Sequence, residues 1–373
     1  MTDKIGVGLI GCGGIARMKH LPALRANADK ARLVAVSDVN LAGAKALAEE
    51  YGGEVSVYAS YEELLADANV DAVHVCSPND THAPISIAAM RAGKHVLCEK
   101  PMAATAAQAE EMLRVSRETG MTLSISYQNR FRDDSQAIYR ACREGLLGEI
   151  YYARAHALRR KVVPTWGVFL DKSRQSGGPL IDIGGHALDL ALWFMDNYDV
   201  ASVTGSVFHK LADHPEANVY GPWEPSKFTV EDSAFGFIRM RDGATVYLES
   251  AWAINMRKPR EAMTTLCGTL GGAEQFEGEF GPGSYSYNIN LPMLGRLMTI
   301  TPDAPCHYSN RVPRRENELM REAPAAEFAA WFDALKNGDK PVVRPEQALT
   351  VMRVLEAIYA SAEQGKTIYF SQQ

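Results

Sequence analysis

Short apolar runs alternate with segments of helical periodicity from residue 4 to about residue 126. The apolar runs cover residues 5–10, 33–37, 71–76, 95–98 and 122–126. The helical segments between them cover residues 14–25, 41–51, 82–92 and 105–119. This alternation is typical of βαβ units, which build a parallel sheet with helices on both faces. We therefore predict an α/β, doubly wound parallel domain over residues 1–126.

The pattern changes after residue 127. Two alternating runs, 229–240 and 244–253, are joined by Arg-Asp-Gly, which is typical of an antiparallel hairpin. We predict a second, α+β domain over residues 127–373. Loops rich in Pro and Gly, 213–227 and 278–313, are expected to be surface excursions or walls of the substrate site.

The end of the chain predicts one more helix and one more strand. The helix runs from Pro345 to about Gln364 and stops at Gly365, which is followed by a strand over 367–370. The helix of about 345–364 is a candidate to pack back on the first domain.

Composition excludes several classes of protein. The chain is 46% hydrophobic and 23% charged, with a net charge of −6 and no long block of one sign, so we expect no binding to nucleic acid or to a membrane. The N-terminus lacks the features of a signal peptide, and no apolar run reaches the ~18 residues of a membrane span. Six scattered cysteines without a CxxC pair favour reduced thiols, a cytoplasmic protein and no metal site. These are Cys12, Cys76, Cys98, Cys142, Cys267 and Cys306.

The glycine cluster Gly11-x-Gly13-x-x-Ala16 follows the first predicted strand and opens the first predicted helix. In this setting the first glycine allows a tight turn, the second lets the backbone approach a pyrophosphate, and the small third residue lets helix and strand pack closely. The helix N-terminus then presents free N–H groups to the phosphates. The alternative is a glycine turn without a ligand.

A carboxylate at the end of the second strand supports the dinucleotide interpretation. Asp38 lies where an acidic residue accepts both ribose hydroxyls, and the neighbouring Val39 and Asn40 offer no cation for a 2′-phosphate. We therefore predict NAD(H) and not NADP(H) as the cofactor.

Three further motifs carry a resemblance to a known family. They are Ser-Pro-Asn-Asp-Thr-His at 77–82, the segment 93–101 that ends in Glu-Lys-Pro, and Gly-Gly-Pro-Leu-Ile-Asp-Ile-Gly-Gly-His-Ala-Leu-Asp at 177–189. Together with the glycine cluster and the closing helix, they resemble the glucose-fructose oxidoreductase, inositol dehydrogenase and rhizopine catabolism family, called Gfo/Idh/MocA. The resemblance implies a Rossmann domain followed by a domain with an open, mainly antiparallel sheet, and an active site in the crevice between them.

The resemblance also assigns residues. The family's catalytic set maps to Lys100, Asp182 and His186, all present without substitution. The expected cofactor contacts share the carboxyl ends of the predicted strands and the helix starts that follow them. They are Gly11, Gly13, Gly14, Ile15, Ala16, Asp38, Ser77, Pro78, Asn79, His82, Glu99 and Lys100. For His82, packing at the following helix start is the alternative.

The chemistry of the catalytic set agrees with oxidation of an alcohol. A hydride leaves carbon while a proton leaves oxygen, so the site needs a base and a group that stabilises the developing alkoxide. Lys100 can donate to that oxygen, and a histidine such as His186 exchanges protons near neutral pH. Asp182 precedes His186 by four residues, so on a helix the carboxylate can orient the imidazole or hold a sugar hydroxyl. Taken singly, each of these residues also has an ordinary structural interpretation.

Several residues of the second domain are candidates for substrate contacts, together with Asp182 and His186. Tyr127 and Arg130, with Asn129 between them, follow the last predicted strand of the first domain, although an Arg there is more often an ion-pair partner at a domain interface. Trp166 can stack on a sugar ring or pack in the interior. Arg159 begins the run Arg-Arg-Lys at 159–161, which is either a solvated basic edge or a site for an anionic group of the substrate.

Three functions remain open from the sequence. The first is an NAD-dependent oxidoreductase that acts on a ring hydroxyl of a sugar, glycoside or polyol. The second is a redox-neutral glycosidase that oxidises the sugar transiently, eliminates the aglycone and returns the hydride, and the third is a sensor that binds dinucleotide without turnover. The resemblance also implies a homodimer or homotetramer through the open sheet face.

Overall fold

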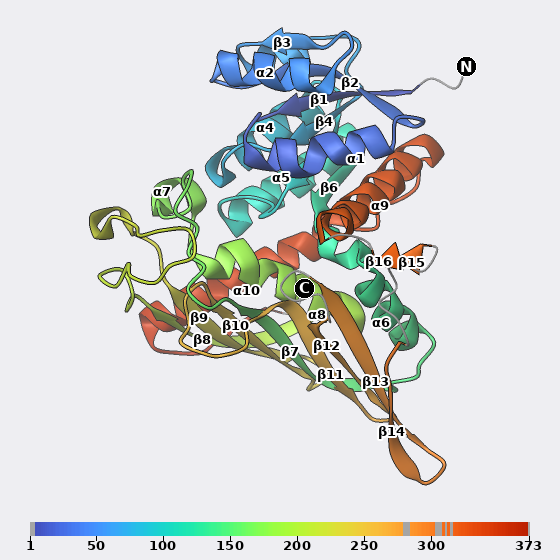
Figure 1. Cartoon of the computed structure of the whole chain (residues 1–373), viewed down its shortest axis with the longest axis vertical. Helices are drawn as coiled ribbons and strands as arrows, with labels where there is room; N and C mark the ends of the chain where they lie inside the picture. Colours follow the sequence, from blue (N-terminus) through green and yellow to red (C-terminus); the bar gives the residue numbers. More distant parts are fainter. Residues whose placement is uncertain (1–3, 279–283, 303–307, 310–311, 314–315, 372–373) are drawn as a thin grey trace. The chain divides into compact units, whose positions relative to one another are not determined.

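The computed structural model describes residues 4–278, 284–302, 308–309, 312–313 and 316–371. By its internal contacts the chain divides into two compact units (Figure 1). Unit 1 comprises residues 1–128 and 320–352, and unit 2 comprises residues 129–319 and 353–373. Residues 320–352 therefore pack with the N-terminal unit, although they follow residue 126. That residues 1–126 and 127–373 are separate domains stays a prediction.

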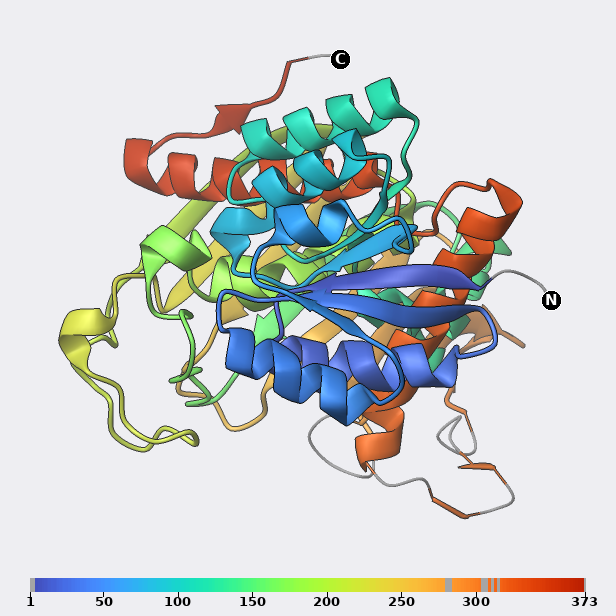
Figure 2. The ribbon, with the colours of Figure 1, turned by 90° about the horizontal axis from the view of Figure 1, so that it is seen from above.

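Unit 1 is a Rossmann-type sheet with helices on both faces. Its strands follow the order β3-β2-β1-β4-β5-β6, and all the paired strands are parallel. Figure 2 shows α1 and α2 on one face of this sheet and α4 and α5 on the other. The elements are β1 Ile5–Ile10, α1 Leu21–Ala26, β2 Ala31–Ser37, α2 Leu41–Tyr51, β3 Ser56–Tyr58, α3 Tyr61–Leu65, β4 Ala72–Val75, α4 Asn79–Arg91, β5 His95–Glu99, α5 Ala106–Thr119 and β6 Leu123–Ser126. The prediction of a doubly wound α/β fold is confirmed.

Local signals place these helices where the sequence leads one to expect them. Asn40 caps α2 by accepting the N–H of Gly43 at 3.1 Å, and Thr105 caps α5 in the same way. Gly120 ends α5 in the left-handed conformation, with φ of +72°. The short β3 and α3 were not predicted, because three and five residues are too few to show a clear period.

Helix α9, Glu316–Asn337, completes the core of unit 1. Phe328, Trp331 and Phe332 on this helix are almost fully buried and belong to the same hydrophobic cluster as Val7 and Leu9 of the central strand. A stretch more than 300 residues downstream therefore helps to hold the first strand of the chain in place.

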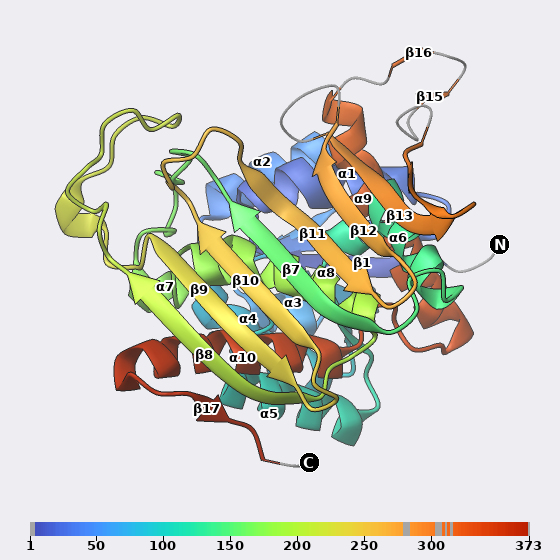
Figure 3. The same ribbon diagram turned by 90° about the horizontal axis from the view of Figure 1, so that it is seen from below.

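Unit 2 is built on one large mixed sheet, with the order β14-β13-β12-β11-β7-β10-β9-β8-β17. The β7–β10 pair is parallel and the other pairs are antiparallel, so the expected open, mainly antiparallel sheet is confirmed. Helices α6 and α8 pack against one face, and within the described residues Figure 3 shows no helix on the other. The elements are α6 Asp133–Arg143, β7 Ile150–Leu158, α7 Lys172–Gln175, α8 Gly185–Met195, β8 Val200–Phe208, β9 Ser233–Met240, β10 Thr245–Ala251, β11 Arg260–Gly268, β12 Gly272–Glu277, β13 Tyr285–Met293, β14 Arg296–Ile300, β15 Tyr308–Ser309, β16 Val312–Pro313 and β17 Ile368–Tyr369. Helix α10, Pro345–Gln364, begins in unit 1 and continues into unit 2 from residue 353.

The prediction that 278–313 is a loop was wrong for β13 and β14. These strands form a hairpin in which Met293 pairs with Arg296, so Leu294 and Gly295 make a two-residue turn, both with positive φ. Pro292 misled the interpretation, since it lies in β13 beyond the last residue that pairs with β12. The predicted hairpin β9–β10, the helix α10 and the last strand are present. No helix within the described ranges is long and apolar enough to cross a bilayer.

Candidate active site

The glycine turn of unit 1 has the backbone that a dinucleotide phosphate needs. Gly11 has φ of +94°, and a Cβ there would lie 2.7 Å from the backbone of Cys76. Its N–H donates to the carbonyl oxygen of Ser37 at 2.9 Å, which ties the turn to the end of β2. A Cβ at Gly13 would meet no atom of the described residues within 4 Å. The turn is therefore closed towards the sheet at Gly11 and open at Gly13.

The carboxylate of Asp38 lies beside this turn. It accepts the N–H of Cys12 and the N–H of Asn40, each at 2.7 Å. The acid at the end of β2 is thus fixed next to the glycine backbone, where a ribose follows a pyrophosphate. The open turn and the fixed carboxylate fit NAD, with the turn against the phosphates and Asp38 against the ribose. Gly14, Ile15 and Ala16 continue the turn into the following helix.

A π-helical turn, Ala16–His20, joins the glycine turn to α1. Ala16 is fully buried against the sheet, while Lys19 and His20 point into the interior of unit 1. Wide turns of this kind are rare and occur frequently at functional sites. The turn brings a lysine and a histidine under the carboxyl ends of the central strands.

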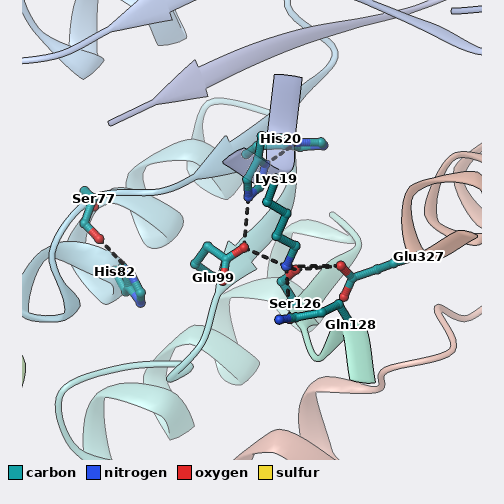
Figure 4. Close-up of polar contacts among 9 residues, drawn as sticks. Lys19, His20, Ser77, His82, Glu99, Ser126, Gln128 and Glu327 are labelled. Atoms are coloured by element: carbon teal, nitrogen blue, oxygen red, sulfur yellow. Dashed lines mark hydrogen bonds and ion pairs between the residues drawn. The ribbon is translucent and has the colours of Figure 1, made fainter. Parts of the chain in front are cut away.

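Lys19 is the centre of a buried polar cluster, which consists of Lys19, His20, Glu99, Ser126 and Glu327 (Figure 4). Its ammonium lies 2.8 Å from Glu99 Oε1, 2.5 Å from Ser126 Oγ and 3.2 Å from Glu327 Oε2. The Ser126 hydroxyl donates to the same Glu327 oxygen at 2.9 Å. One ammonium therefore joins the helix after the glycine turn, the ends of β5 and β6, and α9.

His20 connects the Lys19 cluster to a second histidine, His74. His20 Nε2 lies 2.9 Å from Glu99 Oε1, and its Nδ1 lies 3.1 Å from Nδ1 of His74. A carboxylate only accepts, so His20 donates through Nε2 and accepts at Nδ1 from His74. Burial lowers the pKa of both rings, and that of His74 falls well below its usual range. Both imidazoles are therefore neutral at neutral pH.

The two carboxyl groups of the Lys19 cluster differ in charge. Burial opposes ionisation of Glu99, but Lys19 and His20 outweigh it and hold the pKa of Glu99 well below its usual range. Burial raises the pKa of Glu327 to about 7, and the negative charge of Glu99 adds to this effect while Lys19 opposes it. Burial alone would lower the pKa of Lys19, but Glu327 and Glu99 raise it. Lys19 and Glu99 thus form a permanent ion pair, and Glu327 changes its charge near neutral pH.

Glu99 directly precedes Lys100, so the cluster fixes the strand end that carries the candidate catalytic lysine. The peptide bond between Lys100 and Pro101 is cis. Glu99 was expected to contact the cofactor; in the structure its carboxylate is 5% exposed and directed at Lys19 and His20. Its place favours a supporting role for Lys100.

His82 links the two segments that carry Asn79 and Lys100. The ring is 1% exposed, with Nδ1 at 2.7 Å from the carbonyl oxygen of Pro101 and Nε2 at 2.9 Å from that of Ser77. Burial lowers the pKa of His82 although both carbonyl oxygens act in the opposite direction. This placement favours the alternative in which His82 packs at the start of α4, whose N-cap is Pro78 and whose first residue is Asn79.

In unit 2, close packing fixes the start of the helix that carries Asp182 and His186. The carboxylate of Glu231 accepts the N–H groups of Gly178 at 2.8 Å and Leu180 at 3.1 Å, and the hydroxyl of Tyr359 donates to it at 2.8 Å. A Cβ at Gly178 would lie 2.2 Å from the carbonyl oxygen of Glu231. This explains a glycine at that position. Burial raises the pKa of Glu231, while the bonds from Gly178 and Tyr359 act in the opposite direction.

Asp182 lies in a second π-helical turn, Leu180–Gly184, which runs directly into α8. Its Oδ2 accepts the indole N–H of Trp252 at 2.9 Å and lies 3.6 Å from Nη1 of Arg159. Trp252 is fully buried, so the bond is shielded from water. His186 follows in the first turn of α8, and both it and Asp182 are less than one-tenth exposed.

Arg159 forms its main ion pair with Glu261. Its Nε and Nη2 donate to the two oxygens of that carboxylate at 2.7 and 2.5 Å. Burial alone would lower the pKa of Arg159, but Glu261 and then Asp182 raise it. The fork that was considered for a substrate anion is thus occupied by a residue of the same unit.

Two expected substrate contacts are buried. Arg130 is fully buried, donates to both oxygens of Asp189 at 2.8 and 2.5 Å, and lies over the ring of Trp193. It is an ion-pair partner inside unit 2, and its guanidinium has no exposed surface for a substrate. Tyr127, at the end of β6 in unit 1, is 1% exposed. Trp166, in contrast, is 50% exposed.

Sequence reasoning missed several residues of both units. Lys19 lies three residues after Ala16, the last residue of the glycine motif, and this position in the sequence is a signal that could have been used. Glu327, Trp252 and Glu261 gave no such signal, because each comes from a segment without a motif. In the parts of the chain that the structure describes, no group of three or more His, Cys, Asp and Glu side chains is arranged to hold a metal ion.

Comparison with known proteins gives the family. Residues 5–127 match the family described as an oxidoreductase family with an NAD-binding Rossmann fold, and residues 135–274 match the GFO/IDH/MocA C-terminal domain. The chain belongs to the Gfo/Idh/MocA oxidoreductase family. The resemblance stated from the sequence is confirmed, and so is NAD as the cofactor of this oxidoreductase.

Named relatives of this Gfo/Idh/MocA oxidoreductase match it end to end. D-glucoside 3-dehydrogenase of Escherichia coli (strain K12) is 35% identical over 367 residues, which cover 98% of this chain and 98% of that protein. Myo-inositol 2-dehydrogenase of Thermotoga maritima is 33% identical over 363 residues, 97% of each. The solved structure of levoglucosan dehydrogenase with NADH and levoglucosan has a TM-score of 0.82 at 21% identity, covering 99% of this chain and 100% of that one, which shows a shared fold.

Proposed function

We propose that this oxidoreductase transfers a hydride between a ring hydroxyl carbon of a sugar, glycoside or polyol and NAD. The observation that carries the proposal is the fixed carboxylate of Asp182, held by the buried Trp252 in the turn just before His186. A sugar offers hydroxyl groups to such a carboxylate. The named relatives act, by their names, on glucosides and inositol, which supports the same substrate class here.

Each residue of the catalytic set has a separate task in this proposal. NAD supplies the hydride acceptor. Lys100 donates a hydrogen bond to the oxygen that becomes negative as the hydride leaves its carbon. His186 takes the proton from that oxygen or returns it, and Asp182 holds a hydroxyl or orients the imidazole. The Lys19 cluster holds the strand end before Lys100. The backbone that carries Lys100 is therefore already in place before the reaction begins.

A neutral substrate is favoured over an anionic one. The guanidinium of Arg159 is bound by Glu261 and lies near Asp182, so an incoming carboxylate would have to displace an existing ion pair. Arg160 is exposed, and the partly exposed Lys161 donates to the carbonyl oxygen of His214 at 3.3 Å. Kinetics with a neutral sugar and its acid analogue test this directly, and a preference for the acid would contradict it.

The decisive experiment follows two products at once. The protein is incubated with NAD and a panel of neutral and acidic sugars and glycosides, while reduced nicotinamide and released aglycone are both measured. We expect net NADH formation with a neutral glycoside or sugar. Aglycone release that depends on NAD but gives no net NADH would indicate the redox-neutral glycosidase. NAD binding without either product would indicate a sensor.

We further propose a homodimer or homotetramer that forms through the face of the unit 2 sheet opposite α6 and α8 (Figure 3). On this face Phe237 and Tyr247 are paired across β9 and β10, each about two-fifths exposed, and Arg154 pairs next to Tyr247 on β7. Exposed aromatic rings on a flat sheet are typical of protein interfaces. Light scattering should give at least twice the chain mass, and Phe237→Glu should reduce it; the mass of one chain for the unaltered protein would contradict the proposal.

A cytoplasmic location is also proposed. It is supported by the free thiols of the described cysteines. These are Cys12, Cys76, Cys98, Cys142 and Cys267. Cys306 lies outside the described residues. Thiol titration of the protein isolated under non-reducing conditions should find free thiols, and disulfides there would contradict the assignment.

A further inference from the structure

Two loops of unit 2 present aromatic rings to solvent. Trp166 comes from the loop after β7 and Tyr220 from the loop after β8, and each is 50% exposed. Their ring centroids lie 4.6 Å apart at an angle of 87°, so the two rings form a corner. Phe169 packs against Trp166 at 5.8 Å and continues the aromatic surface inwards. We call Trp166, Phe169 and Tyr220 the aromatic corner.

The aromatic corner is continuous with the surroundings of Asp182. The ring of Phe169 lies 6.5 Å from that of Trp252, whose indole N–H is bonded to Asp182. Tyr220 also lies within electrostatic range of Arg159, which in turn lies 3.6 Å from Asp182. Trp252 and Phe169 therefore connect the carboxylate of Asp182 to Trp166, and Arg159 lies between Asp182 and Tyr220.

The loops that carry the corner are held by hydrogen bonds, most of them centred on Asn218. Its side chain accepts the N–H of Val163 at 2.8 Å and donates to the carbonyl oxygens of Val163 at 3.0 Å and Gly221 at 2.8 Å. The hydroxyl of Thr165 donates to the carbonyl oxygen of Tyr220 at 2.8 Å. The exposed rings are thus fixed in position before any ligand arrives, which lowers the entropy cost of binding.

Burial of aromatic rings in the interior would stabilise the fold. Rings that remain exposed on a fixed frame are therefore typical of ligand sites. A ring with an apolar face can stack on one wall of a perpendicular corner while its edge meets the other. Phe169 and Trp252 form the ring contacts that connect the corner to Asp182. A sugar at Asp182 and a ring at the corner are therefore expected to be two groups of one ligand.

We propose that Trp166 and Tyr220 form a subsite for a second ring that is linked to the sugar bound at Asp182. The preferred substrates are then glycosides whose aglycone is itself a ring, either another sugar or an aromatic group. The inference rests on the proposed function, since Asp182 marks the position of the reacting sugar. It goes further by naming the second ring and the residues that select it.

Calorimetric binding and kinetics with three glycosides of one sugar test the subsite: the methyl glycoside, the phenyl glycoside and a disaccharide. We expect the unaltered protein to favour one of the two larger ligands over the methyl glycoside by about 10-fold in Kd and in kcat/KM. In Trp166→Ala and in Tyr220→Ala this preference should fall to about 2-fold or less, with the methyl glycoside unchanged. The ligand that loses affinity identifies the second ring as aromatic or as a sugar.

Tyr369→Ala is the matched control, because Tyr369 is an exposed tyrosine of the same unit at the sheet edge. It should leave all three Kd values unchanged. Equal affinities for the three ligands in the unaltered protein, or an equal loss for all three in Trp166→Ala, would overturn the subsite. Binding is read without turnover, so failure to form NADH would contradict the proposed function alone.

Discussion

The two units position their candidate site residues by different means. In unit 1 the glycine turn, Asp38 and Lys100 all lie at or just after strand ends, and the backbone of neighbouring strands brings them together. In unit 2 the carboxylate of Asp182 is held by the side chains of Trp252 and Arg159, which are 70 and 23 residues away in the chain and directly follow the paired strands β10 and β7. A backbone arrangement is sufficient to bind a cofactor that a whole family shares. Substrate contacts depend on side chains that each member can change separately.

The largest expected effect concerns residues of both units together. Lys100→Met and His186→Ala should each reduce turnover by about 100-fold or more, because each removes a group that handles the proton or the developing charge. NAD should still bind with nearly unchanged affinity, which fluorescence titration can measure. Normal turnover in either variant would remove that residue from the mechanism and leave its unit with a binding role only.

The second prediction probes the long-range support of Asp182. Trp252→Phe keeps an aromatic ring next to Phe169 but removes the N–H that holds the carboxylate, so kcat should fall by about 10-fold while KM changes less. Trp223→Phe is the matched control, because the Trp223 N–H bonds to the carbonyl oxygen of Ala212 and not to a site residue. Similar losses in both variants would show general loosening of unit 2 and would break the contrast between the units.

The third prediction concerns the cofactor carboxylate. Asp38→Ser should weaken NAD binding by about 10-fold, because the ribose loses a hydrogen-bond partner. It should also reduce the preference for NAD over NADP, because the carboxylate no longer repels a 2′-phosphate. Asp67→Ser is the control, since Asp67 also accepts a backbone N–H in unit 1 at 2.8 Å, from Asn69. Tighter binding of NADP than of NAD by the unaltered protein would already refute this role of Asp38.

The smallest expected effect is on stability. The pKa of Glu327 in the folded chain is raised to about 7, so its contribution to stability is present below about pH 4.5 and is lost as the pH rises through 7. Glu327→Gln cannot ionise, so the fall in stability between pH 5 and 8, of about 1–3 kcal/mol from this group, should be smaller in the variant. Denaturant midpoints across that range measure it.

Glu346→Gln is the control for this measurement, because Glu346 is an exposed glutamate of the same unit, paired with Arg117. Its stability profile should follow that of the unaltered protein. An unchanged slope in Glu327→Gln would show that Glu327 does not take up a proton near neutral pH. The Lys19 cluster would then hold a fixed charge.

These contrasts explain what the sequence could and could not predict. The strands of unit 1, the glycine turn and Asp38 follow from periodicity and local backbone rules, so the sequence was sufficient. Arg130 looked the same in the sequence whether it met a substrate or an ion-pair partner, and its partner Asp189 lies 59 residues away in the chain. Trp252 and Glu327 follow no local rule, because contacts between distant segments are set by how the whole chain packs.

The two π-helical turns, Ala16–His20 and Leu180–Gly184, also determine where the deletion of one residue would do most damage. Each turn contains one residue more than a regular helix would use. Deleting that residue would leave a normal α-helix but rotate the residues before it by about 100° relative to those after it. Lys19 would lose its direction towards Glu99, or Asp182 its direction towards Trp252, although no residue had been substituted. Sequence changes that look harmless in a helix would therefore be most damaging at these two places.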